Sequence, residues 1–303
     1  MTTMREYLAL PAVSASVLRT LLATCPLAAW AESWLNPWQV MINTPATDAG
    51  TIAHAIVLEG RADAVAVIDP KDYPAKTTGA IPEGWTNQAI RAARDAAREA
   101  GKIPVLLPEM ARIDAMVAAT KVYIESLQEH EPAVWRAFQD GRSEESMTWD
   151  EGDVPCKIRP DRIAHTNAVI VDLKFTTTSA QPEAYAQSQI FRQNAHVGAA
   201  LYRRGVKATT GVLPDYYYLV TESDPPYLSS LIGLDPRAYA IGDQMLARAL
   251  AEWQQCARAG IWPAYPARAV YPELPAWMEA HWVEDQIEAG IPYDPAKLFA
   301  RTA

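Results

Sequence analysis

Two short stretches decide the fold: residues 156–161 read Cys-Lys-Ile-Arg-Pro-Asp, and residues 169–174 read Val-Ile-Val-Asp-Leu-Lys. Both are typical of β-strands, and the turn residues at 165–167 separate them. Alternate side chains of a strand share one face, so Asp172 and Lys174 are predicted to lie on the face opposite the three apolar neighbours. A tight connection would bring Asp161 close to Asp172. Charged groups on an apolar strand need a partner, because burying an unpaired charge is costly.

A divalent cation is one such partner for the two carboxylates. Asp161 and Asp172, with a backbone carbonyl and water molecules, form a set of oxygen ligands that suits Mg²⁺ or Mn²⁺. Lys174 would lie beside the same ion, where it can orient or help deprotonate an attacking water and stabilise charge on a phosphate. An Asp-x-Lys pair on a strand is common without any catalytic role, so these residues alone do not decide the function.

The remaining sequence alternates between helical and strand-like segments, which indicates a mixed α/β fold with a central sheet flanked by helices. The N-terminal part is predicted to be mostly helical, with a kink or restart at Pro26. The expected helices cover residues 14–34, 48–58, 86–100, 108–127, 184–204 and 239–259. The expected strands cover residues 64–68, 144–149, 154–159, 168–175, 215–221 and 227–234.

Composition sets outer limits on the class of protein. The chain has 303 residues and a formal net charge of −9, which argues against a broad nucleic-acid-coating surface but allows a local basic channel. Cys25, Cys156 and Cys256 are too few for a disulfide framework or for the four thiolates of an iron–sulfur cluster. No apolar run approaches transmembrane length and the N-terminus lacks a signal-peptide pattern, so a cytoplasmic protein with no membrane contact is expected.

Four further segments, in their order, give the chain a resemblance to a known family. They are the Ser-x-Ser…Pro pattern of residues 14–26, the Gly-x-x-x-His of residues 50–54, the acidic residues 144–145, and the Gly-x-Trp-Pro of residues 260–263. Together with the two strands, they resemble PD-(D/E)XK nucleases of the RecB-like branch. The most similar members are the RecE or exonuclease VIII-like enzymes of phages and prophages. The resemblance covers residues from about 10 to about 280.

The resemblance implies one PD-(D/E)XK domain over residues 1–303. Its mostly helical N-terminal part (1–135) carries the helix of His54, the catalytic core spans residues 136–260, and a Pro- and Trp-rich extension covers residues 261–303. The implied activity is Mg²⁺-dependent exonucleolytic hydrolysis of linear double-stranded DNA, 5′→3′, by in-line attack of a metal-bound water, in recombination or repair. Mn²⁺ is expected to substitute for Mg²⁺. Relatives form rings, so a homo-oligomer and a RecT-like single-strand annealing partner are expected on resemblance alone.

Roles also follow for individual residues. Asp161, Asp172 and the Leu173 carbonyl are implied metal ligands, Lys174 is the implied catalytic lysine, and His54 is a metal ligand or a nearby orienting group. Glu145 either positions a second metal or is a solvated strand residue, and Glu144 is its rival because a shift of one residue exchanges their faces. Lys157 and Arg159 are expected either to bind DNA phosphates or to neutralise the carboxylates.

One helix departs from the family pattern. Relatives carry Tyr-x-x-Gln-x-x-x-Tyr on the helix after the Asp-x-Lys strand, and Tyr202 fits the last position. Ala195 and Gly198 occupy the positions of the first Tyr and the Gln. Gln193, Asn194 or His196 could substitute from a neighbouring turn, and Gln193 and Tyr202 are therefore the predicted DNA contacts of this helix.

Two rival functions stay open at this level. The first is a catalytically impaired DNA-binding or adaptor protein on the nuclease scaffold, which the altered helix would favour. The second is a nuclease of another specificity, either a single-strand exonuclease or a structure-specific endonuclease. Composition does not separate these possibilities.

Overall fold

The structure is a computed structural model that describes residues 4–38, 45–75 and 78–290. The chain divides into two units, Met1–Ala264 and Tyr265–Ala303. The first unit carries every predicted site residue and is built on a five-stranded sheet in the order β3-β6-β7-β8-β9. These strands are β3 (Arg142–Ser143), β6 (Arg162–Ile163), β7 (Val169–Thr176), β8 (Asp215–Glu222) and β9 (Ser229–Gly233).

The centre of the sheet is a parallel pair, β7 and β8, in which Asp172 is opposite Tyr218. Strand β6 pairs with β7 in the antiparallel sense, and so does β9 with β8. A parallel pair needs a long crossover, and helices α8 (Pro182–Tyr185) and α9 (Ala195–Thr210) supply it here. The mixed sheet predicted from the sequence is confirmed.

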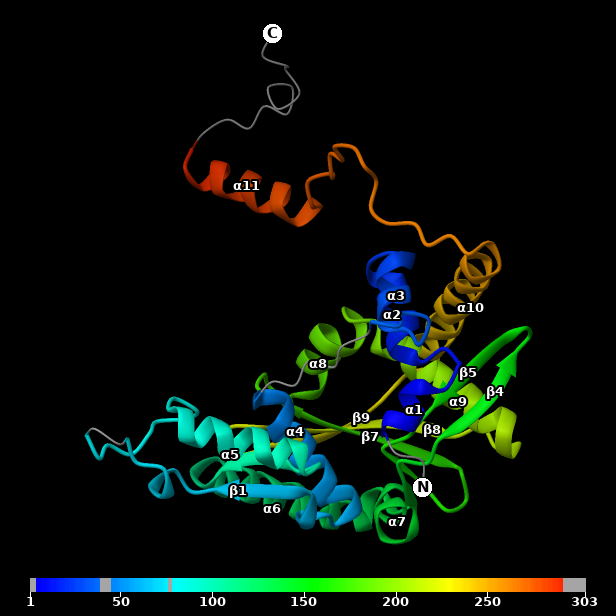
Figure 1. Cartoon of the computed structure of the whole chain (residues 1–303). Helices are drawn as coiled ribbons and strands as arrows, with labels where there is room; N and C mark the ends of the chain where they lie inside the picture. The colour runs from blue at the N-terminus through cyan, green and yellow to red at the C-terminus, as the bar shows by residue number, and fades with distance from the viewer. Residues whose placement is uncertain (1–3, 39–44, 76–77, 291–303) are drawn as a thin grey trace. The chain divides into compact units, whose positions relative to one another are not determined.

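Helices lie on both faces of the sheet (Figure 1), and a layer of buried hydrophobic side chains packs against each face. Ile170 packs into the layer that contains residues of α2 (Ala15–Ala23), α9 and α10 (Pro236–Ala259). Val171 and Leu173 pack into the opposite layer, with residues of α6 (Leu107–His130) and α7 (Pro132–Asp140). The alternation predicted for β7 is therefore confirmed, because its even- and odd-numbered residues enter different layers.

Other elements surround this core. A two-stranded parallel pair, β1 and β2, packs with α4, α5 and α6, and an antiparallel hairpin, β4 and β5, lies next to α9. Their bounds are β1 (Val65–Ile68), β2 (Ile103–Leu106), β4 (Met147–Glu151) and β5 (Val154–Ile158). The other helices are α1 (Met4–Ala9), α3 (Pro26–Glu32), α4 (Pro45–Glu59) and α5 (Gln88–Glu99).

Most predicted elements form, and Pro26 restarts the chain as the first residue of α3. The strand predicted for residues 144–149 is wrong at its start, because Glu144 has a left-handed φ of 55° and β4 begins only at Met147. Strand β5 ends at Ile158, so Arg159 and Asp161 are not on one strand with Lys157. The sequence did not predict α1, α7, α11 (Ala276–Glu288), β2, β3 or β6, of which β3 and β6 have only two residues each.

The helix predicted for residues 184–204 is not continuous. A π-helix, Ala186–Phe191, follows α8, and Asn194 has a left-handed φ of 55° immediately before α9. A π-helix contains i→i+5 hydrogen bonds and so accommodates one additional residue. The Arg192 amide indeed donates to the Gln187 carbonyl, 3.3 Å away. The crossover between Tyr185 and Ala195 is therefore an interrupted helix and not one regular α-helix.

The C-terminal end of the first unit explains part of the Gly-x-Trp-Pro motif. Gly260 ends α10 with a left-handed φ of 65°, and Trp262 packs against Trp253 with ring centroids 4.7 Å apart. The Pro263 carbonyl accepts a hydrogen bond from the Leu27 amide of α3. This motif is thus a structural contact between α3 and α10.

The second unit contains one described helix, α11 (Ala276–Glu288), in which no residue is buried. Large apolar side chains of this unit are exposed, among them Tyr271, Trp277 and Trp282. Residues 291–303, the end of the predicted extension, lie outside the described part. Among the residues that the structure describes, no helix combines the length and the apolar character needed to cross a membrane.

Candidate metal and catalytic site

Asp161 lies immediately before β6, and the pairing of β6 with β7 brings it to Asp172. Arg162 is opposite Val171 in this antiparallel pair, so Asp161 is next to the centre of β7. One Asp161 carboxylate oxygen accepts a hydrogen bond from the Leu173 amide, at 2.9 Å. The structure therefore brings together the two carboxylates that the sequence placed on neighbouring strands.

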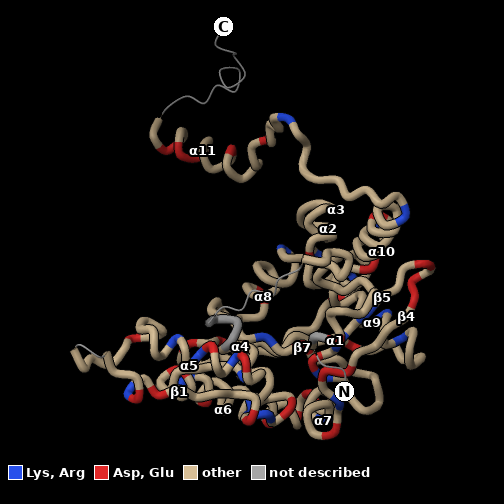
Figure 2. Tube along the Cα trace, viewed as in Figure 1, with Lys and Arg blue, Asp and Glu red and all other residues tan. Residues whose placement is uncertain are grey.

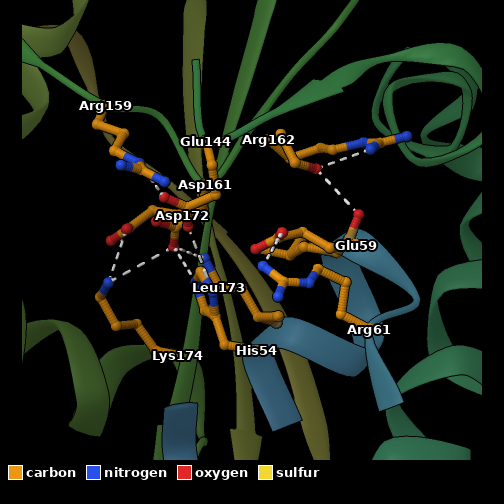
Figure 3. A network of polar contacts seen from close by, with 12 residues as sticks. His54, Glu59, Arg61, Glu144, Arg159, Asp161, Arg162, Asp172, Leu173 and Lys174 are labelled. Atoms are coloured by element: carbon orange, nitrogen blue, oxygen red, sulfur yellow. Dashed lines mark hydrogen bonds and ion pairs between the residues drawn. The ribbon is translucent and has the colours of Figure 1, made fainter. Parts of the chain in front are cut away.

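Lys174 points toward both carboxylates (Figure 3). Its Nζ is 2.7 Å from Asp172 Oδ1 and 3.9 Å from Asp161 Oδ2. The side chain of Lys174 is 43% exposed, whereas those of Asp161 and Asp172 are 15% and 14% exposed. The Lys174 side chain is thus more exposed than the two carboxylates that it contacts.

His54 comes to this site from α4, more than one hundred residues before Asp161 in the chain. Its Nε2 is 2.9 Å from Asp161 Oδ2, and its Nδ1 is 3.5 Å from Glu144 Oε1. The second carboxylate neighbour of His54 is Glu144, which turns toward the site because of its left-handed backbone. The Arg159 guanidinium forms an ion pair with Glu144 and keeps that carboxylate in place.

The prediction that Glu145 belongs to the site is wrong. The Glu145 carboxylate is 43% exposed and lies 2.6 Å from Arg142 Nε, away from His54. In the predicted strand, successive side chains would point to opposite faces. The left-handed φ of Glu144 breaks this alternation and directs the Glu144 side chain inward. The rival residue, Glu144, is therefore the acidic group of this segment that reaches the site.

His54, Glu144 and Asp161 form a group that could hold a metal ion, since one ligand atom from each lies within 4.8 Å of the others. One imidazole and two carboxylates suit Mg²⁺ or Mn²⁺ better than a soft ion, because oxygen ligands dominate. Asp172 adjoins the group through Asp161 and Lys174. The donor set fits a divalent cation, and the position of the Leu173 carbonyl as a further ligand stays a prediction.

Burial and mutual charge shift the titration of these groups. Burial raises the pKa of Asp172 to about 6, and the Asp161 charge adds to this effect against the opposing charge of Lys174. Burial would raise the pKa of Asp161 as well, but Lys174 and His54 outweigh it and hold this pKa below its usual range. The pair therefore shares its charge unequally, with Asp161 the more readily ionised carboxylate.

The two basic partners respond in the opposite sense. Burial opposes the charge of Lys174, but Asp172 and Asp161 outweigh it and raise its pKa. The pKa of His54 is also raised, because Asp161 and Glu144 outweigh the effect of burial. Carboxylates thus favour the charged form of both groups, and a bound cation would displace the proton of His54 when this imidazole acts as a ligand.

Lys157 does not contribute to this site, and the prediction that it binds DNA is wrong. Its side chain is only 4% exposed, and its Nζ donates to the carbonyls of Tyr7, Leu8 and Leu10 at 2.9–3.0 Å. It thus ties the end of α1 to β5. Arg159 takes the alternative role foreseen for it, since it neutralises the Glu144 carboxylate.

The predicted DNA contacts of the crossover lie in different surroundings. Gln193 is exposed and donates to Gln189. The Tyr202 hydroxyl donates to the Arg159 carbonyl at 3.3 Å, and its ring packs edge-on against Tyr216. Tyr202 is therefore a packing residue behind the site, while Gln193 stays a predicted contact.

The sequence analysis missed Tyr185, which lies closer to the catalytic groups. The Tyr185 side chain is buried, and the charges of Lys174 and Asp172 act on its pKa, which burial raises. Gln189 follows it on the π-helix, so the two form a Tyr-x-x-x-Gln pair. They lie well before Ala195 and Gly198 in the chain, so they are separate from the aligned positions of the family pattern.

Charged residues of both signs are interspersed along the described chain and do not gather in one basic run (Figure 2). A substrate with a negatively charged backbone must therefore be recognised locally, by groups such as Lys174. This agrees with the net charge of the chain.

Comparisons with known proteins bear on the family and the fold of the chain. A family described as "PDDEXK-like domain of unknown function (DUF3799)" matches residues 14–273. Among solved structures, the chain is similar to a protein from Eubacterium rectale described as a "putative exonuclease", with a TM-score of 0.52, 12% identity, and coverage of 92% of this chain and 98% of that chain. At such low identity this likeness shows the fold alone.

A second structure, described as SSO0001, is similar at 10% identity over 66% of this chain and 85% of that chain. Its TM-score of 0.25 carries no argument. No curated protein matches the sequence.

Proposed function

Because this chain belongs to the PDDEXK-like domain family (DUF3799), matched over residues 14–273, we propose that it is a metal-dependent DNA nuclease that hydrolyses phosphodiester bonds. The observation that carries the proposal is the convergence of His54, Glu144 and Asp161 within 4.8 Å, beside the Asp172–Lys174 ion pair. These residues come from four separate segments of the chain. A structural ion pair would not need so many groups in one place.

Mg²⁺ is the cation that we propose, with Mn²⁺ as a substitute. When bound, a divalent cation lowers the pKa of a water ligand and polarises the phosphate. The His54, Glu144 and Asp161 side chains would hold it, and Asp172 adjoins them. Lys174 is the exposed cation of the group, so it can bind a non-bridging phosphate oxygen and stabilise the charge that develops there.

Tyr185 and Arg159 support these groups without reaching the reacting atoms. The Tyr185 side chain is buried, and its pKa responds to the charges of Lys174 and Asp172, so it belongs to the surroundings of these two residues. Arg159 fixes the carboxylate of Glu144, which in turn faces His54. Partners of this kind orient metal ligands, and their loss commonly weakens metal binding.

The finer proposal is a 5′→3′ exonuclease of the RecE-like branch that acts on linear double-stranded DNA in recombination or repair, in the cytoplasm of a bacterial or phage-infected cell. The order of sequence motifs supports the branch. A ring-shaped homo-oligomer and a RecT-like annealing partner belong to this proposal on the same ground. The rival idea of an impaired adaptor protein keeps its ground, since Ala195 and Gly198 still occupy the positions of the family Tyr and Gln.

A digestion experiment tests the proposal. Linear duplex labelled at either the 5′ or the 3′ end is incubated with the full chain and Mg²⁺, with chelator and Asp172→Ala as controls. Release of the 5′ label first, lost in both controls, supports a 5′→3′ exonuclease. Nicking of closed circular DNA would make the protein an endonuclease, and DNA binding without any cleavage would refute the nuclease proposal.

A further inference from the structure

A cleft of about 440 Å³ opens beside the candidate metal site, at the end of β7. Gly50 lines it from α4, Thr176 lines it from the end of β7, and Gln189 lines it from the π-helix. Its size lies within the range of roughly 300–1,000 Å³ that is common for small-molecule sites.

The cleft is a direct continuation of the catalytic groups on three elements. Gly50 precedes His54 by one helical turn on α4, so the two lie on the same helix face, about 5–6 Å apart. Thr176 follows Lys174 by two residues on β7 and therefore shares its face of the strand. On the third element, Gln189 follows Tyr185. Each of these three elements thus carries one residue at the metal site and a second residue, within four positions of it in the sequence, that lines the cleft.

The lining of the cleft suits a nucleoside better than a phosphate. Its apolar part includes Ile113 and Met116, which are almost fully buried, and Phe175, which is partly exposed and can offer its face to a base. Its polar part includes the hydroxyl and amide groups of Thr177, Thr178 and Gln189 and the carboxylates of Glu109 and Asp224. The Arg112 guanidinium at the far end is 3.0 Å from the Asp224 carboxylate, so its charge is already matched. Phosphates are usually bound by unmatched Arg or Lys side chains.

A second cleft, of about 670 Å³, lies on the other side of His54. It is lined by Glu144 and by Leu58, which follows His54 by one turn on the same face of α4. With a cleft on each side of the candidate metal site, a DNA strand could place one nucleoside on each side of the scissile phosphate. The Gly50 cleft contains one such ion pair, Arg112 with Asp224, whereas two ion pairs of Arg with Glu, at Arg61 and Arg142, lie around Leu58.

We infer that the Gly50 cleft binds the nucleoside next to the scissile phosphate, and that Gly50 keeps this place open. The inference rests on the proposed nuclease function. A Cβ atom built on Gly50 meets no atom within 4 Å, so the glycine is not required by packing. Its φ is not in the left-handed region, so a larger side chain can be placed there without backbone strain and would project into open space.

The test is a volume series at this position: Gly50→Ala, Gly50→Leu and Gly50→Phe. Leu and Ala have a higher helix propensity than Gly, so these variants are expected to fold, with a melting temperature no lower than that of the natural chain. Thr51→Leu is the matched control, because Thr51 is the exposed neighbour on the same helix and does not line the cleft. Mn²⁺ binding, followed by electron paramagnetic resonance, reports separately on the metal site.

Two readouts are taken for every variant: binding of thymidine 5′-monophosphate in the presence of Ca²⁺, and KM for cleavage of linear duplex with Mg²⁺. We expect the nucleotide Kd and the KM to rise by at least about tenfold in Gly50→Leu and further in Gly50→Phe, with Mn²⁺ affinity and the Thr51→Leu values unchanged. Equal nucleotide binding by Gly50→Leu and the natural chain would overturn the inference, as would the absence of nucleotide binding by the natural chain.

The two proposals fail in different ways. If the natural chain cleaves DNA and Gly50→Phe cleaves it with the same KM, the nuclease function stands and the subsite is refuted. If the natural chain does not cleave DNA but binds the nucleotide in a manner sensitive to Gly50→Leu, the nuclease function is refuted and the subsite is supported as a nucleotide site.

Discussion

Two lysines on the strands that decided the fold have opposite fates. Lys174 on β7 is 43% exposed and faces the carboxylates of Asp172 and Asp161. Lys157 on β5 is 4% exposed and donates to three backbone carbonyls at the end of α1. Burial lowers the pKa of Lys157 to about 8, while its three acceptors favour the ammonium, which alone has three N–H donors.

The difference between them teaches what makes a charged strand residue functional. The donors of Lys157 are saturated by acceptors that cannot move away, so the lysine is a structural tie between the N-terminal helix and the hairpin. The side chain of Lys174 is partly exposed, and its carboxylate partners can instead bind a cation. A charge with exchangeable partners can do chemistry, whereas a charge with saturated partners stabilises the fold.

The largest expected effect is on the rate of DNA cleavage, where Lys174 should matter and Lys157 should not. Lys174→Met should lower kcat for DNA cleavage by about 10²–10³-fold, because it removes a cation that stabilises charge on the phosphate. Lys157→Met should keep its kcat, measured per folded molecule at low temperature, because this side chain does not reach the site. Single-turnover cleavage of labelled duplex measures both rates. Equal losses of cleavage rate in the two variants would contradict the different roles assigned to the two lysines.

The next largest effect is on stability, where Lys157 is expected to matter more than Lys174. Lys157→Met should lower the free energy of unfolding by about 3 kcal/mol, since it leaves buried carbonyls without their charged donor. Urea unfolding followed by circular dichroism gives this value. The matched control is Arg258→Met, which breaks an exposed ion pair with Asp153 and should cost less than about 1 kcal/mol. A loss for Lys157→Met as small as that of the control would contradict the proposed tie.

A third prediction compares two adjacent acids. Glu144→Gln should weaken Mn²⁺ binding by about 10–100-fold, because the Glu144 carboxylate belongs to the group around His54. Glu145→Gln should leave the Mn²⁺ affinity as it is, because its carboxylate pairs with Arg142 outside the site. Isothermal titration calorimetry at one pH measures both affinities. Weaker Mn²⁺ binding by Glu145→Gln than by Glu144→Gln would mean that Glu145, and not Glu144, faces the site.

The smallest expected effect is a pH dependence of metal binding. The raised pKa of Asp172, about 6, means that its carboxyl group is ionised above pH 6 and protonated below it. A cation competes with that proton and with the proton of His54, whose pKa is also raised, so Mn²⁺ affinity should fall as the pH is lowered and most steeply below about 6. Calorimetry over pH 5–8 follows the change, and Asp172→Asn should reduce the fall below pH 6. An Mn²⁺ affinity that is flat between pH 5 and 7 would show that Asp172 takes no part in binding the ion.

Local pattern predicted much of the fold and part of the site. The alternation along β7 fixed the face shared by Asp172 and Lys174, and the restart at Pro26 followed from the missing amide of proline. The same reasoning failed at Glu144 and along the crossover, where a left-handed residue and a π-helix shift the periodicity by one residue. Such irregularities arise from tertiary packing, which compensates for their local cost.

The sequence by itself therefore determined which side chains of β7 point the same way, since backbone geometry sets the two-residue period of a strand. It could not determine that His54 and Glu144 meet Asp161, or that Lys157 turns toward α1 while Lys174 stays open. Those outcomes depend on how segments distant in the chain pack against one another. Only the folded core fixes these distances, because the burial of apolar surface that drives packing has no preferred direction of its own.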